Sequence, residues 1–480
     1  MSPLAWSIWL SVACTPEKKP MSLDPLAERP TIEAPAAFSP AEPQPLTLDN
    51  GIELWLLERP DLPLVSLRML VDGGASEDPA HIPGLASMTD AMLTHGAGDR
   101  DAAAFASFVE QQAISLGVST GALVSVAYLD AHTERLDIAL DLFADMIRRP
   151  QLNHDDLLRV RGLHIGALQQ TLDDPRSVAP DISSRVYFGA SHPIAHPEIG
   201  TEVGLNRITV DDLRASWQQR FVPNRARLVV VGAVDADALT AALNARFTGW
   251  VAGEDAADVP PPAGVNGGPR LILVDNPDAS QSILRVVMPG WTADDPERVA
   301  GELATIAIGG TFTSRLNQLM REEKGYTYGA SVRANISRNF GTLIASSSVN
   351  QPATAEALQD MLAVIKSGHD GFSVEELDRA RESNRTDFIE AMGTRSRTAA
   401  ILSRLVQQGL PTDGLRTRLD DASAVTPEAM QAAWSTRANL DRALILIVGD
   451  LSVIQQSVEA VLPGPWQVVP REFPTPDDPR

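Results

Sequence analysis

The sequence predicts an α+β protein in which one kind of domain is written twice in tandem. Each copy is expected to form a mixed or mostly antiparallel sheet with helices packed on one face. Two observations predict this fold class: residues recur at one constant offset along the chain, and strand-like segments bracket long helical segments. With 480 residues, of which 44% are hydrophobic, the chain is long enough to build two domains with real cores.

The duplication is visible as pairs of identical residues 217 positions apart. Pro60 and Pro277 give the offset (277 − 60 = 217), and Trp217 and Trp434 repeat it near the ends of the two copies (434 − 217 = 217). An offset that stays constant over most of both halves indicates repeat architecture. Further pairs are Arg68 and Arg285, Gly73 and Gly290, Asp78 and Asp295, Gly84 and Gly301, and Gly232 and Gly449.

Local patterns supply the elements of each copy. Apolar residues alternate on both sides of Asn50-Gly51, which predicts a β-hairpin. Thr209 and Thr426 occupy equivalent positions and are predicted to N-cap equivalent helices. The other predicted elements are strands at 64–71, 228–231 and 444–448 and helices at 102–112 and 134–147.

Composition divides the chain into segments. Residues 258–269 are rich in Pro and Gly and poor in packing groups, which predicts a linker between the two copies. The predicted segments are a signal at 1–20, a Pro- and Ala-rich tether at 21–44, a first domain at 45–255, the linker at 256–269, a second domain at 270–466 and a tail at 467–480.

Charge and cysteine content exclude several classes of function. The chain has 40 Lys and Arg against 62 Asp and Glu, a formal net charge of -22, which argues against nucleic acid as a partner. A single cysteine, Cys14, allows neither an internal disulfide nor a thiolate metal cluster. No segment beyond the N-terminal residues is expected to cross a membrane.

The N-terminus resembles a bacterial lipoprotein signal. A short apolar stretch at 4–13 ends in a small residue, and Cys14 follows where the lipidated cysteine stands in such signals. No Lys or Arg precedes the stretch, and Ser11 replaces the preferred Leu, so a misassigned start or a plain frayed terminus is the alternative. The signal implies a periplasmic or membrane-anchored lipoprotein, touching the membrane only through Cys14.

Several further stretches keep a distinctive order and spacing. They are GGASED at 73–78, GLA at 84–86, HP at 192–193, IGT at 199–201, RLVVVG at 227–232, GGTFTSRL at 309–316 and LMREEKGYTYG at 319–329. Together they resemble the insulinase or pitrilysin-type (M16) metallopeptidase family in its short two-domain form. The resemblance covers nearly everything from Pro45 to Pro463. It implies the LuxS/MPP-like metallohydrolase fold.

The resemblance also implies where zinc would be bound. In the family, a helix reading H-x-x-E-H supplies two His ligands and a Glu that deprotonates the attacking water, and a later helix supplies a Glu ligand. Here Ser87, Asp90 and Ala91 stand at the His, Glu and His positions, and Ala167 stands near the later Glu. All three metal ligands are missing, so no metal site is expected in this chain. Asp90 is expected to be a solvated helix residue.

The remaining histidines do not supply a substitute metal site. His192 and His196 are four residues apart, but the sequence His-Pro-Ile-Ala-His-Pro forbids the helix that would align them, so a turn in a surface loop is expected. His95 follows the degenerate zinc helix, and His164 lies on the helix that lacks the Glu. Two histidines without a carboxylate make a poor site.

The second copy keeps more of the family pattern. In the family, an Arg and a Tyr seven residues apart face the zinc across a closed chamber, and Arg321 and Tyr328 match them here (328 − 321 = 7). A guanidinium can hold a peptide carbonyl or carboxylate, and a phenol can donate to a developing oxyanion. Tyr326 is a second candidate. The structural alternative is that Arg321 caps a helix and that the Tyr328 ring is buried at the start of a strand.

This pattern predicts a non-catalytic subunit of a heterodimeric zinc endopeptidase. Arg321 and Tyr328 would serve, in trans, the H-x-x-E-H site of a partner chain that holds the zinc, and the substrate would be an extended peptide. The chain alone is expected to be inactive and to bind no cofactor. Two alternatives stay open: a structural or assembly scaffold of peptidase-like fold, and a homodimeric peptide-binding protein without chemistry.

Overall fold

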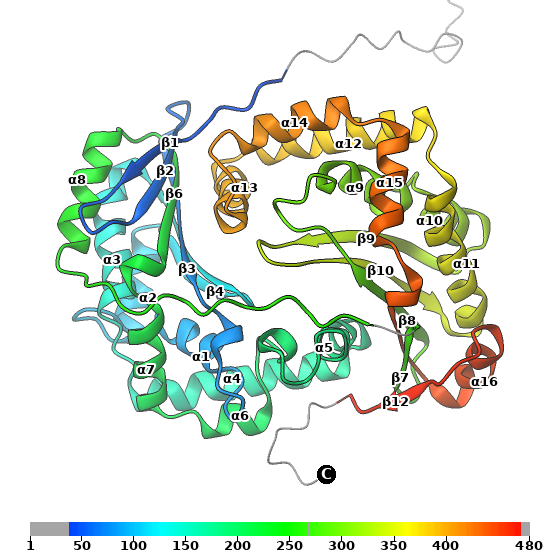
Figure 1. The fold of residues 1–480 in the computed structure, drawn as a ribbon. Coiled ribbons are helices and arrows are strands. Elements are labelled where there is room, and N and C mark those ends of the chain that lie inside the picture. Colours follow the sequence, from blue (N-terminus) through cyan, green and yellow to red (C-terminus); the bar gives the residue numbers. More distant parts are fainter. Residues whose placement is uncertain (1–37, 266–267, 472–480) are drawn as a thin grey trace, which may run out of the picture. The chain divides into compact units, whose positions relative to one another are not determined.

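Within the residues that the structure describes, 38–265 and 268–471, the chain forms two six-stranded sheets, one in each predicted copy (Figure 1). Their strand orders are β1-β2-β6-β3-β5-β4 and β12-β7-β11-β8-β10-β9 in this computed structural model. Cys14, the predicted signal, most of the tether and the last residues of the tail lie outside the described residues.

The first sheet begins with the predicted hairpin. Its turn places Gly51 at φ 87°, in the left-handed region that favours glycine. β2 and β6 run parallel, while the other neighbouring strands are antiparallel, so the sheet is mixed, as predicted. The strands are β1 (Gln44–Thr47), β2 (Glu53–Glu58), β3 (Leu64–Asp72), β4 (Ser115–Thr120), β5 (Val124–His132) and β6 (Ala226–Gly232).

The second sheet repeats the first at the predicted offset. β7 (Arg270–Asp275) begins 217 residues after β2 (270 − 53 = 217), and β8 (Gln281–Pro289) begins 217 residues after β3 (281 − 64 = 217). β12 (Gln467–Val469) pairs in parallel with β7 and lies beyond residue 466, the predicted end of the domain. The remaining strands are β9 (Thr327–Ile336), β10 (Gly341–Asn350) and β11 (Leu444–Gly449).

The helices also follow the duplication. Thr209 and Thr426 N-cap α7 and α15, as predicted, by accepting from the backbone N–H of Asp212 and Ala429. No helix of the described residues is long and apolar enough to span a bilayer. The helices are α1 (Leu85–Met92), α2 (Ala102–Gln111), α3 (Leu136–Arg148), α4 (His154–Asp173), α5 (Pro175–Phe188), α6 (Glu202–Arg207), α7 (Val210–Arg220), α8 (Ala236–Phe247), α9 (Arg298–Thr305), α10 (Arg315–Asn317), α11 (Thr354–Ser367), α12 (Val374–Ala391), α13 (Arg395–Gln408), α14 (Gly414–Ala424), α15 (Pro427–Arg437) and α16 (Leu451–Val461).

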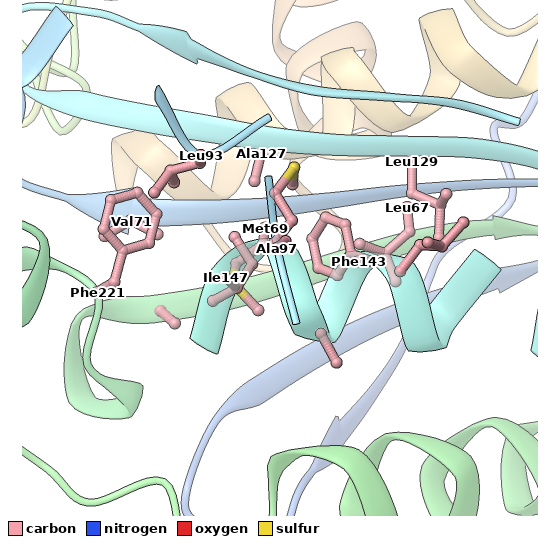
Figure 2. Packing of buried hydrophobic residues seen from close by; sticks show 14 of the residues in the cluster. Leu67, Met69, Val71, Leu93, Ala97, Ala127, Leu129, Phe143, Ile147 and Phe221 are labelled. Carbon is pink, nitrogen blue, oxygen red and sulfur yellow. The ribbon is translucent and has the colours of Figure 1, made fainter. Parts of the chain in front are cut away.

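One face of each sheet packs against helices of its own half. In the first half, Leu67 and Met69 of β3 and Leu129 of β5 belong to the same buried cluster as Phe143 and Ile147 of α3 (Figure 2). Alternate residues of a strand point to the same face, which is why Leu67 and Met69 enter this core together. A corresponding cluster in the second half contains the buried Trp291 and Trp434.

The opposite face of each sheet is covered by a helix from the other half, which the sequence did not predict. Val178 and Ile182 of α5 cluster with buried residues of β11, and Leu402 and Leu405 of α13 cluster with buried residues of β6. α13 begins 220 residues after α5 (395 − 175 = 220), so the two copies exchange equivalent helices. The exchange buries apolar surface between the halves and ties them into one compact unit from Pro40 onward.

Candidate functional site

The helix that would carry the zinc motif, α1, is anchored at its start by a half-buried carboxylate. Asp78 accepts hydrogen bonds from the backbone N–H groups of Gly84 (2.7 Å) and Ala86 (2.8 Å). Gly84 has φ 96°, and a Cβ on it would lie 2.8 Å from the Ile199 carbonyl oxygen, so glycine is required there. Burial raises the pKa of Asp78 to about 7, because it outweighs the two N–H donors and the nearby Arg220.

The zinc-ligand positions carry no usable metal donors. Ser87 and Ala91 are half-buried on α1, and Ala167 is exposed on α4. The Ser87 hydroxyl lies 3.4 Å from Nε2 of His164, which shows that α1 and α4 meet at this place. Alanine side chains cannot ligate zinc, and the Ser87 hydroxyl is a weak ligand beside the imidazole and carboxylate donors that zinc prefers.

Asp90 is a buried ion-pair partner, so the prediction of a solvated residue was wrong. Its side chain is 1% exposed and lies 2.5 Å from Nη2 of Arg220, which is 2% exposed. The hydroxyls of Thr120 (2.7 Å) and Ser125 (2.5 Å) donate to its second oxygen. Arg220 also donates to the Ser125 hydroxyl, which closes the hydrogen-bond network around the carboxylate. Asp90 is therefore held as a structural anion and is not free to act as a base.

The histidines likewise form no metal site. His95 and His164 are close enough to influence one another, and burial together with His95 lowers the pKa of His164. Each ring places Nδ1 by the carbonyl four residues earlier, that of Ala91 (2.8 Å) for His95 and that of Val160 (3.2 Å) for His164. Across residues 38–265 and 268–471, no three His, Cys, Asp or Glu side chains are grouped to hold a metal ion. The residues present do not fit the zinc that the family resemblance implies.

The loop with the other two histidines is more deeply packed than predicted. His192 is 8% exposed, and its Nε2 donates to the carbonyl of Pro260 at 2.9 Å. His192 also contacts the ring of Phe188, at 5.0 Å between ring centroids. The turn itself is confirmed, as a short 3₁₀ segment at Pro193–Ala195, but the surface location expected for His192 was wrong.

A cavity of about 880 Å³ adjoins the degenerate site, between α2, the beginning of β4 and the start of α4. Its floor is apolar, with Phe105, Ile114 and Leu116, and its rim includes His95 and Glu110. β4 is the terminal strand of the first sheet, so one of its edges is not paired within the described sheet. This cavity and strand edge offer space for an extended chain on the first half.

Arg321 lies in a π-helical segment, Gln318–Glu323, of the second half. Such segments are rare and occur frequently at functional sites. Its guanidinium carbon lies 4.5 Å from the ring centroid of Phe312, and its Nε lies 3.4 Å from a carboxylate oxygen of Glu322. Nη1 is buried and has no hydrogen-bond partner among the described residues. The guanidinium is thus held in place while keeping an unused donor. No pattern in the sequence distinguishes Phe312.

Tyr328 is 91% exposed at the start of β9, so the alternative in which its ring is buried does not hold. Thr327 pairs with Val349 and Ala330 with Ser347, which leaves two residues of β9 opposite one residue of β10. This is a β-bulge at Tyr328 and Gly329, and bulges re-aim side chains, often beside active sites. The Gly329 N–H donates to the Thr327 hydroxyl at 3.0 Å, which stabilises the bulge.

Tyr326 and Arg315 are already engaged within the chain. The Tyr326 hydroxyl donates to Glu356 of α11 at 3.3 Å, and desolvation together with Asp360 and Glu356 raises its pKa to about 12. Arg315 forms a two-pronged ion pair with Glu376, at 2.6 and 2.8 Å. Arg315 therefore shapes the start of its own helix, α10. Of the two tyrosines, Tyr328 is the one with a free hydroxyl presented to solvent.

Comparisons with known proteins agree with this fold and with the degenerate site. The model described as insulinase (peptidase family M16) matches residues 56–187, and the model described as peptidase M16 inactive domain matches residues 207–384. A Mycobacterium leprae protein described as an uncharacterized zinc protease is 26% identical over 391 residues, covering 80% of this chain and 87% of that protein. A Helicobacter pylori protein described as a non-peptidase homolog is 25% identical over 278 residues, covering 58% and 63%. A crystal structure of a peptidase M16 inactive domain from Pseudomonas fluorescens shares the fold, with a TM-score of 0.79 and 23% identity over 85% of this chain and 98% of that chain.

Proposed function

Since the chain belongs to the insulinase (M16) family, we propose that it is the non-catalytic, substrate-binding subunit of a heterodimeric zinc endopeptidase. The observation that carries the proposal is the contrast between the two halves. In the first, Asp90 is locked in a buried ion pair and the ligand positions carry Ser87 and alanines. In the second, Arg321 and Tyr328 keep unused hydrogen-bonding groups in a bulged and π-helical setting.

The chemistry of these two side chains suits a peptide whose bond is being hydrolysed. The guanidinium of Arg321, whose side chain is 34% exposed, can donate to a main-chain carbonyl, and a charged donor makes that hydrogen bond strong. The exposed hydroxyl of Tyr328 can donate to the oxygen that becomes negative at the scissile carbonyl. Neither group performs hydrolysis by itself, so the zinc and the general base must come from an H-x-x-E-H partner.

The edge of the second sheet supplies a place for the substrate backbone. β9 is the terminal strand of that sheet, and it begins at Thr327, one residue before Tyr328. A terminal strand offers its free N–H and C=O groups to an added strand, and on β9 these exclude the groups of Ala330, which are bonded to the side chain of Asn317. An extended peptide alongside β9 would therefore pass close to the Tyr328 bulge. Extended binding requires an unfolded substrate, because a folded chain has its backbone groups already paired.

The proposal is tested by zinc analysis and reconstitution of the purified full chain. After incubation with zinc and dialysis, we expect well below about one zinc per chain, because the ligand positions lack donors. A chain with an intact H-x-x-E-H motif, sought first in the adjacent reading frames, should cleave a quenched fluorescent casein substrate at full rate only after this chain is added. Stoichiometric zinc and peptide cleavage by this chain alone would overturn the proposal.

Reconstitution with the partner also distinguishes the proposal from the scaffold alternative. A scaffold would form a stable complex with its partner, and the function of that complex would survive the loss of Arg321 and Tyr328. A homodimeric peptide-binding protein would bind casein without any partner and would not increase the rate of cleavage.

We also propose that the chain is a periplasmic or membrane-anchored lipoprotein whose lipid is carried by Cys14, which lies outside the described residues. The support is the apolar stretch that ends in a small residue directly before this cysteine. Mass spectrometry of the mature N-terminus in a bacterial host should find a diacylglyceryl cysteine at position 14. An unmodified N-terminus that retains residues 1–13 would contradict the assignment.

A further inference from the structure

Phe312 is a large apolar side chain that the fold leaves in water. It is 71% exposed, and it lies in the loop that follows the π-helical segment Ile306–Gly310. Its ring lies against Arg321, whose guanidinium carbon is 4.5 Å from the ring centroid. A phenylalanine leaves water readily, so an exposed ring beside a charged group with an unused donor points to a ligand that covers it.

A buried asparagine connects Phe312 to the other two residues. Asn317 is 7% exposed, and its side-chain amide donates to the carbonyls of Thr311 (2.8 Å) and Ala330 (2.9 Å). Its carbonyl oxygen accepts from the Ala330 N–H at 2.9 Å. One side chain thus fixes the residue before Phe312 and the residue two positions after Tyr328. Arg321, which is half-buried, lies four residues further along the same helical segment and contacts Phe312, so one framework holds Phe312, Arg321 and Tyr328.

The carboxylates around this surface outnumber its cations apart from Arg321 and favour a neutral acceptor on the ligand. Glu322 and Glu323 follow Arg321 directly, Lys324 comes next, and the nearby Tyr326 hydroxyl is bonded to Glu356. A ligand carboxylate would meet these like charges, whereas a main-chain carbonyl would not. The half-buried guanidinium of Arg321 therefore suits a carbonyl, and the exposed rings of Phe312 and Tyr328 suit an apolar side chain next to it.

We propose that Phe312 is a third ligand-contacting residue of the Arg321 and Tyr328 surface, and that it makes this surface select peptide segments with a large apolar side chain and no acidic neighbour. The inference rests on the proposed function, because it assumes that this surface binds peptide. Phe312 acts in two ways. Its ring supports the guanidinium of Arg321, and its exposed face packs against the apolar side chain of the ligand.

The test uses the full chain and four fluorescein-labelled ten-residue peptides of Gly and Ser that differ only at one central position, which is Phe, Leu, Ser or Glu. Fluorescence anisotropy measures each dissociation constant. We expect the wild type to bind the Phe and Leu peptides more tightly than the Ser peptide, and the Glu peptide most weakly. Phe312→Ala should weaken binding of the Phe peptide by about tenfold and that of the Ser peptide by no more than about twofold. Phe312→Tyr, which keeps the ring, should restore the preference.

The matched control is Val453→Ala, which removes an exposed apolar side chain from α16, away from the surface in sequence and element. It should change none of the four dissociation constants. If Phe312→Ala weakens the binding of all four peptides equally, the ring only supports Arg321 and does not determine the selectivity. If Phe312→Ala changes nothing while Arg321→Ala and Tyr328→Phe weaken binding, the inference fails and the proposed function stands. If the wild type binds none of the peptides, or if none of the three substitutions changes binding, both fail.

Discussion

Replacement of Arg220 by methionine is expected to lower the free energy of unfolding by about 3–5 kcal/mol, because it leaves the buried charge of Asp90 without its partner. Both side chains are at most 2% exposed and lie 2.5 Å apart. The hydroxyls of Thr120 and Ser125 remain as donors to Asp90. They do not neutralise its charge. Urea unfolding of the purified chain, followed by circular dichroism, measures the loss as a shift of the midpoint.

Two further variants identify the cause of this loss. Arg149→Met removes an ion pair with Asp145 whose arginine is 58% exposed, and it should cost less than about 1 kcal/mol. Asp90→Leu combined with Arg220→Met replaces the whole pair by apolar side chains and should recover most of the stability. If the double variant is no more stable than Arg220→Met alone, the stranded charge is not the reason for the loss.

The error over Asp90 shows what sequence reasoning could not reach. The family resemblance placed Asp90 at the position of the catalytic Glu and placed Ser87 and Ala91 at two of the zinc-ligand positions. The burial and ion pairing of the Asp90 carboxylate depend on Arg220, 130 positions away at the end of α7. Nothing in local periodicity indicates which distant side chain will meet a given helix face. A burial error of this kind is therefore expected wherever a polar residue is satisfied by a long-range partner.

The duplication, in contrast, was predictable because identical residues recur at equivalent positions of the two copies. The constant offset predicted the repeated sheet, and Thr209 and Thr426 predicted equivalent helix starts. The exchange of α5 and α13 between the halves was not predictable, since periodicity shows which face of a helix is apolar but not which sheet that face covers. The bulge that exposes Tyr328 depends on strand register, which one sequence does not fix.

The largest functional effect is expected from Tyr328→Phe in the complex reconstituted with an H-x-x-E-H partner. Removal of one hydrogen-bond donor to an oxyanion typically slows an enzyme by about 10²- to 10³-fold. The substitution deletes a single oxygen from a side chain that is 91% exposed, so the fold should be unaffected. Because the oxyanion exists only in the transition state, we expect kcat to fall while KM stays nearly constant.

Arg321→Ala should change both parameters in the same assay, because a guanidinium that holds a substrate carbonyl contributes before and during the reaction. Arg321→Lys should restore only part of the activity, since a lysine cannot reproduce the planar group that lies against Phe312. Tyr326→Phe is the matched control. Its hydroxyl is already bonded to Glu356, so its loss should alter the cleavage rate by no more than about twofold to threefold. A complex that cleaves at full rate with both Arg321→Ala and Tyr328→Phe would show that the second half of this chain holds the complex together and does not contact the reacting bond.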